Sequence, residues 1–407
     1  MRTFRQFGRD RDGNVAVVFA LMLLPVVAMA GFALDYTRAT QARSSLQMAA
    51  DTAAIAAVSA YVPSNQQREA IARSTFRGMA QDAPPNVTVN ATAQRAVVVA
   101  NARVKPAVIG IVQPEEIAIG ARAVAVKVYD GPPPCILALS PVVAGAIRLT
   151  EGAALTGQGC VLHANSSNST AIAVESHVSL KAAGTCAVGT ITSSQLIEPR
   201  PQAYCDVMDD PFRALPAPTS TACQFGRGAG HVGPGETRVL DPGVYCDGLD
   251  LKGNVTLKPG LYVVRDGPLA IGPQAKVSGQ GVTFYLTGSK AGLNVKGDAV
   301  SLSAATEGTY RGLLFVQDRN AAAGGKSILS GGEATKLLGA IYLPTQSLTL
   351  EGAPSKGRDG AVLSSRFLPI IAEQVKIAGA VSVAADPSVM TLPRPLPRSQ
   401  SGARLEQ

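Results

Sequence analysis

One stretch of the sequence, Val15–Leu34, contains no charged residue across twenty positions. As an α-helix rising about 1.5 Å per residue it would be about 30 Å long, which matches the hydrocarbon core of a bilayer. Basic residues precede it at Arg2, Arg5 and Arg9. Because cytoplasmic flanks of membrane helices are enriched in Lys and Arg, we expect a basic cytoplasmic N-terminus at residues 1–14, a transmembrane helix at 15–34 and an exported remainder.

A cleavable signal peptide is the alternative for this stretch. The small-residue pattern Ala28-Met29-Ala30 fits a signal cleavage site, but four further apolar residues follow it. Signal peptides have a shorter apolar region that ends at the cleavage site. The length of the apolar stretch therefore favours a membrane anchor that is not cleaved.

The helical pattern continues beyond the apolar stretch, since no Gly or Pro interrupts residues 36–62. Ala49, Ala53 and Ala57 recur at four-residue spacing, so one face is smooth enough for close contact with another helix or a sheet. We interpret this face as a helix-docking face. Alternating Val and polar residues in 86–104 and 117–130 predict strands. Residues 35–130 are thus predicted to form a pilin-like helical stem with a small β-sheet.

Several motifs are combined in residues 8–62: a basic start, Gly13-Asn14, FAL…LP…GFALDY and LQMAADTAAIA. This combination resembles the N-terminal region of TadG-like proteins of the tight-adherence (Flp) pilus assembly system. The resemblance implies a bacterial inner-membrane or envelope protein. In related pseudopilins a prepilin peptidase cuts after a glycine, with glutamate at the fifth residue beyond. The cut would fall at Gly13-Asn14, but Val18 stands where the glutamate belongs, so we expect an unprocessed N-terminus.

The rest of the chain has a different pattern. Three consecutive prolines predict an extended linker at 131–134. Between 135 and 385, short apolar pairs such as Leu249 and Leu251 are divided by Gly and polar turns. This pattern favours a β-rich solenoid, with a parallel β-helix preferred and a β-sandwich as the alternative. The fold class is therefore α+β followed by all-β. Residues 386–407 have low apolar content and are predicted to be disordered.

All six cysteines lie in the part predicted to be exported, and none has the CxxC spacing of a zinc or redox site. An even number in an exported chain predicts disulfides, and the sequence does not choose among the pairings. The candidates are Cys135, Cys160, Cys186, Cys205, Cys223 and Cys246.

Residue patterns for catalysis are weak throughout the chain. The histidines share no ligand spacing, and the neighbouring aspartates Asp241, Asp247, Asp250 and Asp266 read as turn residues. The net charge of +8 is spread along the chain and indicates no nucleic-acid partner. We therefore predict no catalytic residue, no cofactor and no metal site.

These observations and the resemblance favour a non-enzymatic, membrane-anchored envelope protein of Flp/Tad-type pilus assembly and adherence. It would cross the inner membrane once and act by contact with other pilus-assembly proteins or with a surface glycan. Its C-terminal body would be periplasmic or surface-exposed. The alternative is a membrane-tethered β-helix carbohydrate-active enzyme or glycan-binding protein. A third reading is a passive spacer that spans the periplasm.

Overall fold

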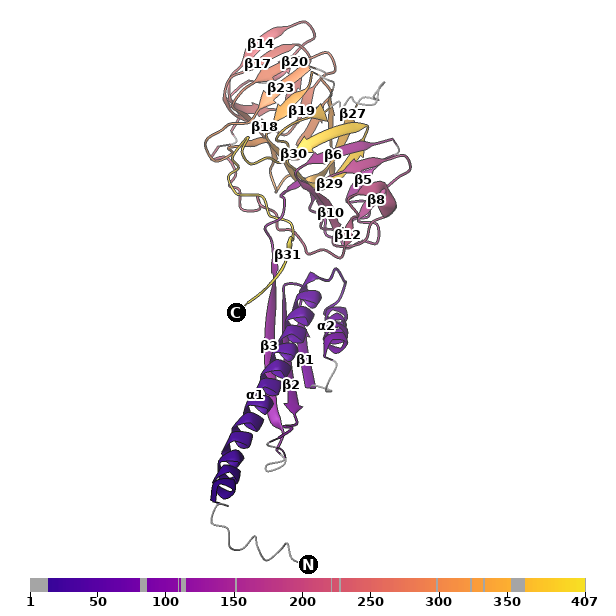
Figure 1. Cartoon of the computed structure of the whole chain (residues 1–407). Helices are drawn as coiled ribbons and strands as arrows, with labels where there is room; N and C mark the ends of the chain where they lie inside the picture. Colours follow the sequence, from indigo (N-terminus) through magenta and orange to yellow (C-terminus); the bar gives the residue numbers. More distant parts are fainter. Residues whose placement is uncertain are drawn as a thin grey trace, which may run out of the picture. The chain divides into compact units, whose positions relative to one another are not determined.

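The computed structural model describes residues 14–80, 86–108, 110, 115–150, 152–220, 222–226, 228–297, 299–322, 324–331, 334–352 and 363–406. The chain divides into two compact units. Unit 1 contains residues 1–128 and 402–407, and unit 2 contains residues 129–401. Figure 1 follows the chain through both.

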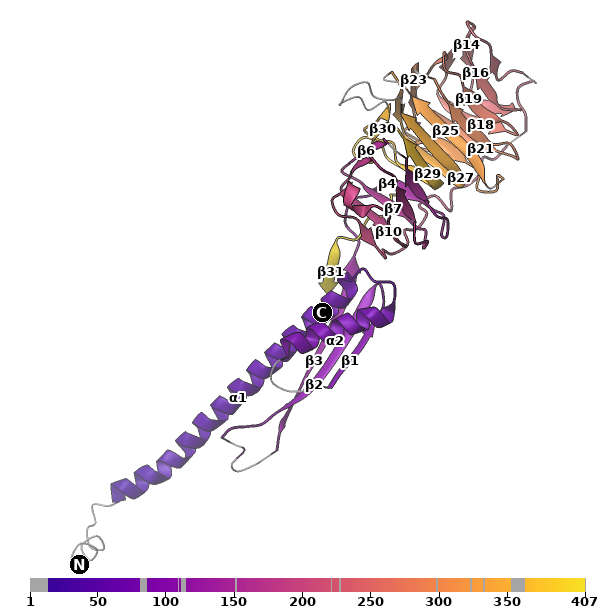
Figure 2. The same ribbon diagram turned by 90° about the vertical axis from the view of Figure 1, so that its right-hand side faces the viewer.

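Unit 1 combines two helices with one antiparallel sheet. The sheet has the order β1-β2-β3-β31, so the end of the chain adds a strand to the hairpin of β2 and β3. Figure 2 shows α1 and α2 beside β1, β2 and β3. The elements are α1 (Asn14–Ser59), α2 (Asn65–Met79), β1 (Asn86–Ala91), β2 (Arg95–Val104), β3 (Ile117–Val128) and β31 (Gly402–Leu405).

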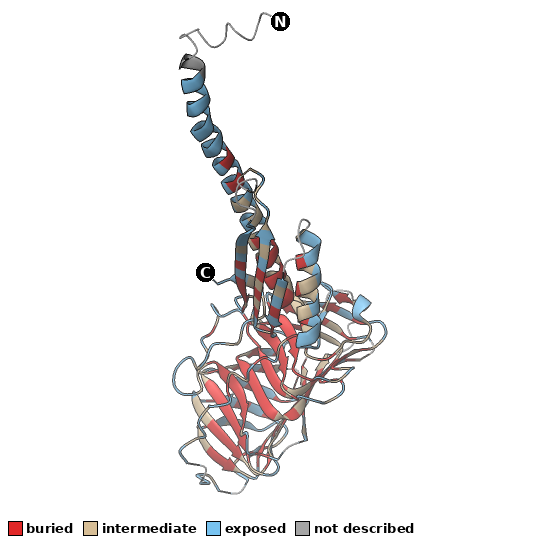
Figure 3. Cartoon of the chain, turned by 90° about the horizontal axis from the view of Figure 1, so that it is seen from below, coloured by how far each residue is buried: buried red, intermediate tan, exposed pale blue. Residues whose placement is uncertain are grey.

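The core of unit 1 consists almost entirely of small residues. Ala49, Ala53 and Ala57 on α1 pack with Val98 of β2 and Phe76 of α2, and all five side chains are buried. Alanines at four-residue spacing keep this face of the helix flat, so the sheet can approach closely. Figure 3 shows the contrast along the stem: its free end is mostly exposed and its other end is mostly buried.

Two residues in the connection between α1 and α2 separate the helices. Pro63 cannot continue a helix, and Ser64 then caps α2 by accepting a hydrogen bond from the Gln67 N–H at 3.2 Å. The buried guanidinium of Arg68 donates to the carbonyls of Ala60 and Val62. These two carbonyls belong to the connection between the helices, and a third bond at 3.5 Å reaches the Ala57 carbonyl in the last turn of α1, which the helix itself leaves unpaired.

Unit 2 is a large β-rich body in which the strands form three columns of parallel pairs. Column A contains β15 (Gly243–Cys246), β18 (Gly260–Arg265), β21 (Val282–Thr287), β24 (Leu313–Gln317), β27 (Ala340–Gly352), β29 (Ile370–Ala378), β4 (Pro134–Ala138), β7 (Val161–Ala164), β10 (Gly184–Ala187) and β12 (Gln202–Ala203).

Column B shares β27 and β29 with column A because both strands are long enough to take part in two columns. Its other strands are β13 (His231–Val232), β16 (Leu249–Leu251), β19 (Pro268–Ile271), β22 (Gly292–Val295), β25 (Gly325–Gly331), β5 (Ile147–Leu149) and β8 (Ile172–Val174).

Column C consists of two separate sheets, one at each end of the body. The first has the strands β14 (Thr237–Leu240), β17 (Asn254–Leu257), β20 (Lys276–Gly279), β23 (Ala299–Ser303) and β26 (Lys336–Leu338). The second has β28 (Leu363–Ser364), β30 (Ala380–Ala384), β6 (Ala154–Gln158), β9 (Ser179–Lys181) and β11 (Ile197–Glu198), which follows the short 3₁₀ helix Ser194–Leu196. Parallel pairing distinguishes these columns from the antiparallel sheets of a β-sandwich.

The strands of the body do not stack in the order of the sequence. Ile370 of β29 pairs with Ile136 of β4, and Ala380 of β30 pairs with Ala154 of β6. The last strands of the body therefore lie against its first strands. Strands β13, β14 and β15 instead begin the columns at the opposite end. Strands β27, β29 and β30, the last strands of the body in the sequence, therefore lie in the middle of the stack.

Side chains alternate between the core and the surface along most strands, as the predicted pattern requires. In β17, Val255 and Leu257 are buried, whereas Asn254 and Thr256 are exposed. A row of stacked rings runs from strand to strand through the core, with centroid separations of 4.5–6.1 Å. Its members are Phe225, Tyr245, Tyr262, Phe284 and Phe315.

A crossing segment, residues 206–218, which we call the strap, covers the outer face of column A. Its Met208 and Phe212 pack on a second apolar cluster that includes Val263 and Tyr342. Asp210 of the strap accepts a hydrogen bond from the Tyr342 hydroxyl at 2.9 Å and forms an ion pair with Arg319. The strap carries the chain from β12, at one end of column A, toward β13, which begins column B at the opposite end of the body.

The segment predicted to be disordered, 386–407, is ordered in its described residues 386–406. Met390 is buried in the main core, and Leu392 and Leu396 pack against the apolar clusters. Residues 402–405 then form β31 through backbone hydrogen bonds, which do not require apolar side chains. Few apolar residues are therefore enough to order this segment, because it packs on apolar clusters and on a strand edge that the rest of the chain forms.

Candidate functional site

The most distinctive surface of the chain is the first part of α1. From Val17 to Leu34 every residue except Gly31 is exposed, including Phe19 at 66% and Leu24 at 68%. Among the described residues, this is the one helix long and apolar enough to cross a membrane. A continuous apolar surface of this size is unstable in water. The helix is therefore compatible with a single-pass membrane anchor.

The end of this apolar surface contacts the hairpin of β2 and β3. The carboxylate of Asp35 is buried and accepts hydrogen bonds from the backbone N–H groups of Ala107 at 2.7 Å and Val108 at 3.0 Å. The Val108 side chain occupies the space that a Cβ at Gly31 would need. Sequence reasoning missed this contact. The signal was present, since a carboxylate directly after an uncharged span requires a partner.

The predicted helix-docking face is occupied by the chain itself. Ala49, Ala53 and Ala57 have no exposed surface, because the sheet of unit 1 and helix α2 cover them. In the described structure this face therefore contacts the sheet and α2 of its own unit. A row of alanines permits close contact with a helix or a sheet equally well, and here the chain supplies the sheet.

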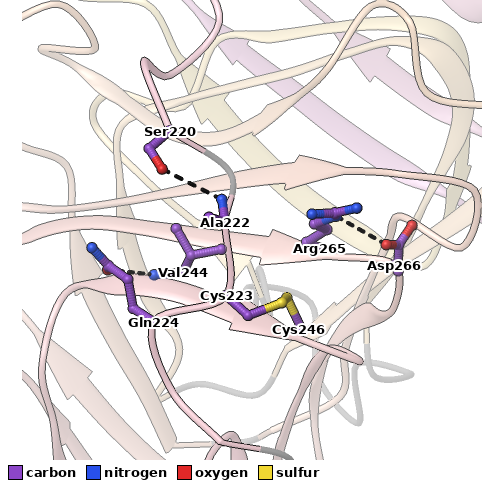
Figure 4. The surroundings of a disulfide bond; sticks show 8 residues. All are labelled: Ser220, Ala222, Cys223, Gln224, Val244, Cys246, Arg265 and Asp266. Atoms are coloured by element: carbon purple, nitrogen blue, oxygen red, sulfur yellow. Dashed lines mark hydrogen bonds and ion pairs between the residues drawn. A yellow bond between two sulfur atoms is a disulfide. The ribbon is translucent and has the colours of Figure 1, made fainter.

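The six cysteines form three pairs in unit 2, and no cysteine is free. The Cα–Cα distances are 5.3, 6.0 and 5.7 Å for Cys135–Cys160, Cys186–Cys205 and Cys223–Cys246. Figure 4 shows the third pair, beside which the Gln224 side chain accepts a hydrogen bond from the Val244 N–H at 3.0 Å. The disulfide therefore joins the segment that precedes β13 to strand β15.

The other predicted site residues, Gly13 and Asn14, lie at the start of the chain. Gly13 is outside the described residues, and Asn14 is the first residue of α1. The possible but disfavoured peptidase site at Gly13-Asn14 therefore lies partly outside the described residues, and the expectation of an unprocessed N-terminus stays a prediction.

The aspartates that could have formed a catalytic or metal group lie in separate surface contacts. Asp241 pairs with Lys258 at 2.7 Å, Asp250 with Lys252 at 2.8 Å, and Asp266 with Arg265 at 3.0 Å. In the described parts of the chain, no three His, Cys, Asp or Glu residues are grouped as a metal ion would require. His163 is different: it is buried, and burial lowers its pKa to about 4.

A groove of about 570 Å³ lies over β15, β18 and β21, between residues 216–220 and 305–310. Val244, Leu261 and Val263 contribute apolar surface, and hydroxyl and amide groups come from Thr219, Ser220, Gln224, Thr283 and Tyr310. Glu307 provides the carboxylate among the described residues that line it. The groove can therefore hold an extended ligand by apolar and hydrogen-bonding contacts.

Comparison with known proteins gives one match, in the N-terminal region. No curated protein and no solved structure matches the chain. Residues 13–60, which include the whole of α1, match the family model described as putative Flp pilus-assembly TadE/G-like. The resemblance stated from residues 8–62 is thus confirmed, and the apolar helix with its alanine-rich continuation is the TadE/G-like part of this chain.

Proposed function

We propose that this protein is a non-enzymatic envelope component of Flp/Tad-type pilus assembly and adherence, held in the bacterial inner membrane by residues 15–34. One observation carries the proposal. The segment that matches the pilus-assembly family, residues 13–60, is also the segment whose apolar side chains are exposed from Val17 to Leu34. A helix with that surface is stable in lipid.

The orientation follows from charge and from cysteine chemistry. Arg2, Arg5 and Arg9 precede the span, which supports a cytoplasmic N-terminus. The three disulfides of unit 2 support an oxidising compartment for the body, because cytosolic thiols are kept reduced. The body is accordingly periplasmic or surface-exposed.

The body acts by contact rather than by catalysis. Its three columns of parallel strands support a solenoid of the parallel β-helix type, in which each turn of the chain adds one strand to a column. Such a form presents long surfaces to partners. These surfaces bind other pilus-assembly proteins.

A glycan-binding body is the second candidate, and the groove over β15, β18 and β21 favours it. Its hydroxyl and amide groups suit the hydrogen-bonding groups of a sugar. Glycoside hydrolysis needs two carboxylates at a defined separation, whereas Glu307 is the acidic side chain among the described lining residues. The groove thus supports binding of a glycan without cleavage.

The test combines a chromosomal deletion with complementation. Pilus formation and surface adherence are scored separately, and the full chain is expected to restore both. A variant with Leu23→Arg and Leu24→Arg is expected to fail, because each arginine at the centre of a span costs about 2.5–3.5 kcal/mol. Met48→Arg, at an exposed position beyond the span, is the matched control and should restore function.

The outcomes separate the two candidates. Loss of pili and of adherence supports the assembly role, whereas loss of adherence with normal pili supports the glycan-binding body. Normal pili and normal adherence in the deletion strain would rule out both.

A further inference from the structure

The β2–β3 hairpin reaches a part of α1 that is otherwise uncovered. From Val17 to Ser45, Gly31 and Asp35 are the buried positions of the helix. Both contacts come from one end of the hairpin: Val108 fills the space beside Gly31, and the N–H groups of Ala107 and Val108 donate to Asp35. This end of the hairpin is therefore held at a defined height on the helix.

That height lies within the apolar span. Gly31 comes three residues before the last uncharged residue, Leu34. At about 1.5 Å per residue, Gly31 lies about 4–5 Å inside the end of the span. Because Val108 packs against Gly31, Val108 lies at the same depth.

The sequence of the hairpin end suits this environment. Residues 106–114 read PAVIGIVQP and carry no charge. Lys105 directly precedes them, Glu115 and Glu116 follow them, and Lys105 forms an ion pair with Glu116 at 3.9 Å. An apolar segment bounded by charges is typical of a surface that enters the membrane interface while its polar flanks stay outside.

The hydrogen bonds to Asp35 support the same conclusion. A carboxylate at the edge of a bilayer is costly unless donors compensate for the lost water. Two backbone N–H groups of the hairpin supply such donors. The contact thus satisfies the carboxylate and also holds Ala107 and Val108 at the edge of the lipid.

We propose that the end of the β2–β3 hairpin, at Pro106–Val108, inserts beside α1 into the outer leaflet of the bilayer, among the acyl chains nearest the headgroups. This inference rests on the membrane anchoring of residues 15–34 proposed above. A single helix can rotate about its axis and tilt freely in lipid. A second insertion point removes that freedom and gives unit 1 one orientation relative to the membrane.

The chain contains no tryptophan, so an introduced indole reports on one position only. Three full-length variants, Ala107→Trp, Leu24→Trp and Gln94→Trp, are reconstituted separately in phosphatidylcholine vesicles. Quenching of fluorescence is then measured in vesicles that contain two brominated lipids, one brominated near the headgroup end of its acyl chains and one near their methyl end. Ala107 is exposed, so the indole needs no space in the core, and the backbone donor to Asp35 remains.

The two other positions are controls. Leu24 lies in the span and reports on insertion of α1. Gln94 is exposed in the turn between β1 and β2, at the opposite end of a ten-residue strand that is about 33 Å long. Trp at position 94 should remain unquenched.

Quenching at position 107 at least half as strong as at position 24, without quenching at 94, is the expected result. Quenching at 24 with none at 107 would overturn the hairpin insertion and leave the anchor intact. If position 24 is also unquenched, the anchor itself fails and the inference fails with it. As a second probe, Ala107→Cys adds the only free thiol, because the native cysteines are paired. It should react more slowly with a charged maleimide than Gln94→Cys.

Discussion

Asn165 and Met208 are joined by two hydrogen bonds. The Asn165 side-chain Nδ2 donates to the Met208 backbone carbonyl at 2.8 Å, and the Met208 N–H donates to the Asn165 side-chain Oδ1 at 2.9 Å. The amide thus pairs with the strap as a neighbouring strand would. Since Asn165 directly follows β7, this contact fixes the start of the strap to column A.

Asn165→Ala should destabilise the body by about 2 kcal/mol, because it removes both bonds and leaves two buried backbone groups of Met208 without partners. Denaturant unfolding of the purified protein in detergent measures the loss, and faster hydrogen exchange at the Met208 amide locates it. Asn254→Ala, at an exposed position on β17, should change stability by less than about 0.5 kcal/mol. Equal effects of the two substitutions would contradict the role of the amide.

The buried imidazole of His163 predicts a loss of stability in acid. Burial lowers its pKa from 6.5 to about 4, and the nearby Asp206 opposes this effect only in part. Between those values the unfolded chain binds a proton that the folded chain does not. Above pH 6.5 His163 therefore makes its full contribution to the free energy of unfolding. As the pH falls toward 4, the free energy of unfolding decreases by about 3 kcal/mol in total through this group.

In His163→Gln the free energy of unfolding should change less between pH 6.5 and 4 than it does in the parent protein. Carboxylates titrate in both proteins, so the difference between the two curves isolates the imidazole. An unchanged slope in the His163 variant would show that the imidazole is not buried in its neutral form.

Ala53→Leu should destabilise unit 1 by about 1–3 kcal/mol, since a larger side chain has no space between α1 and the sheet. Hydrogen exchange of the β2 and β3 amides in detergent provides a readout specific to this unit. The same change at Ala70, which is exposed on α2, is the matched control and should have little effect. If both substitutions left exchange in β2 and β3 unchanged, the face would be open rather than covered.

The disulfide between Cys223 and Cys246 should stabilise the end of the body where β13, β14 and β15 begin. Its partners are separated by 23 residues. Replacing both by Ser should cost about 3 kcal/mol through the greater freedom of the unfolded chain. Unfolding midpoints of the parent and the double variant check this under oxidising conditions. After full reduction the two midpoints should coincide, and a persisting difference would mean that the serines act by another route.

Local sequence patterns were sufficient to predict several features of the fold. An uncharged run of the length of a bilayer core indicates a membrane helix because lipid excludes charge. The alternation that buries Val255 and Leu257 indicates strands because successive side chains of a strand point to opposite faces. The same local information identified the TadE/G-like region, which lies within a single helix.

Long-range contacts were decided only by the tertiary structure. Pairing of Ile370 with Ile136, and of Cys223 with Cys246, joins segments whose local sequences fit several partners equally well. Ala53 could have faced another protein, and Asp35 could have bound any donor. The C-terminal strand β31 is ordered through backbone bonds to β3, which composition does not reveal. By itself the sequence determined the long apolar helix and the alternating strands, because those patterns depend on neighbouring residues, whereas α2 was not predicted. Only the fold decided which surfaces meet, because that choice depends on shape, register and chain path over the whole molecule.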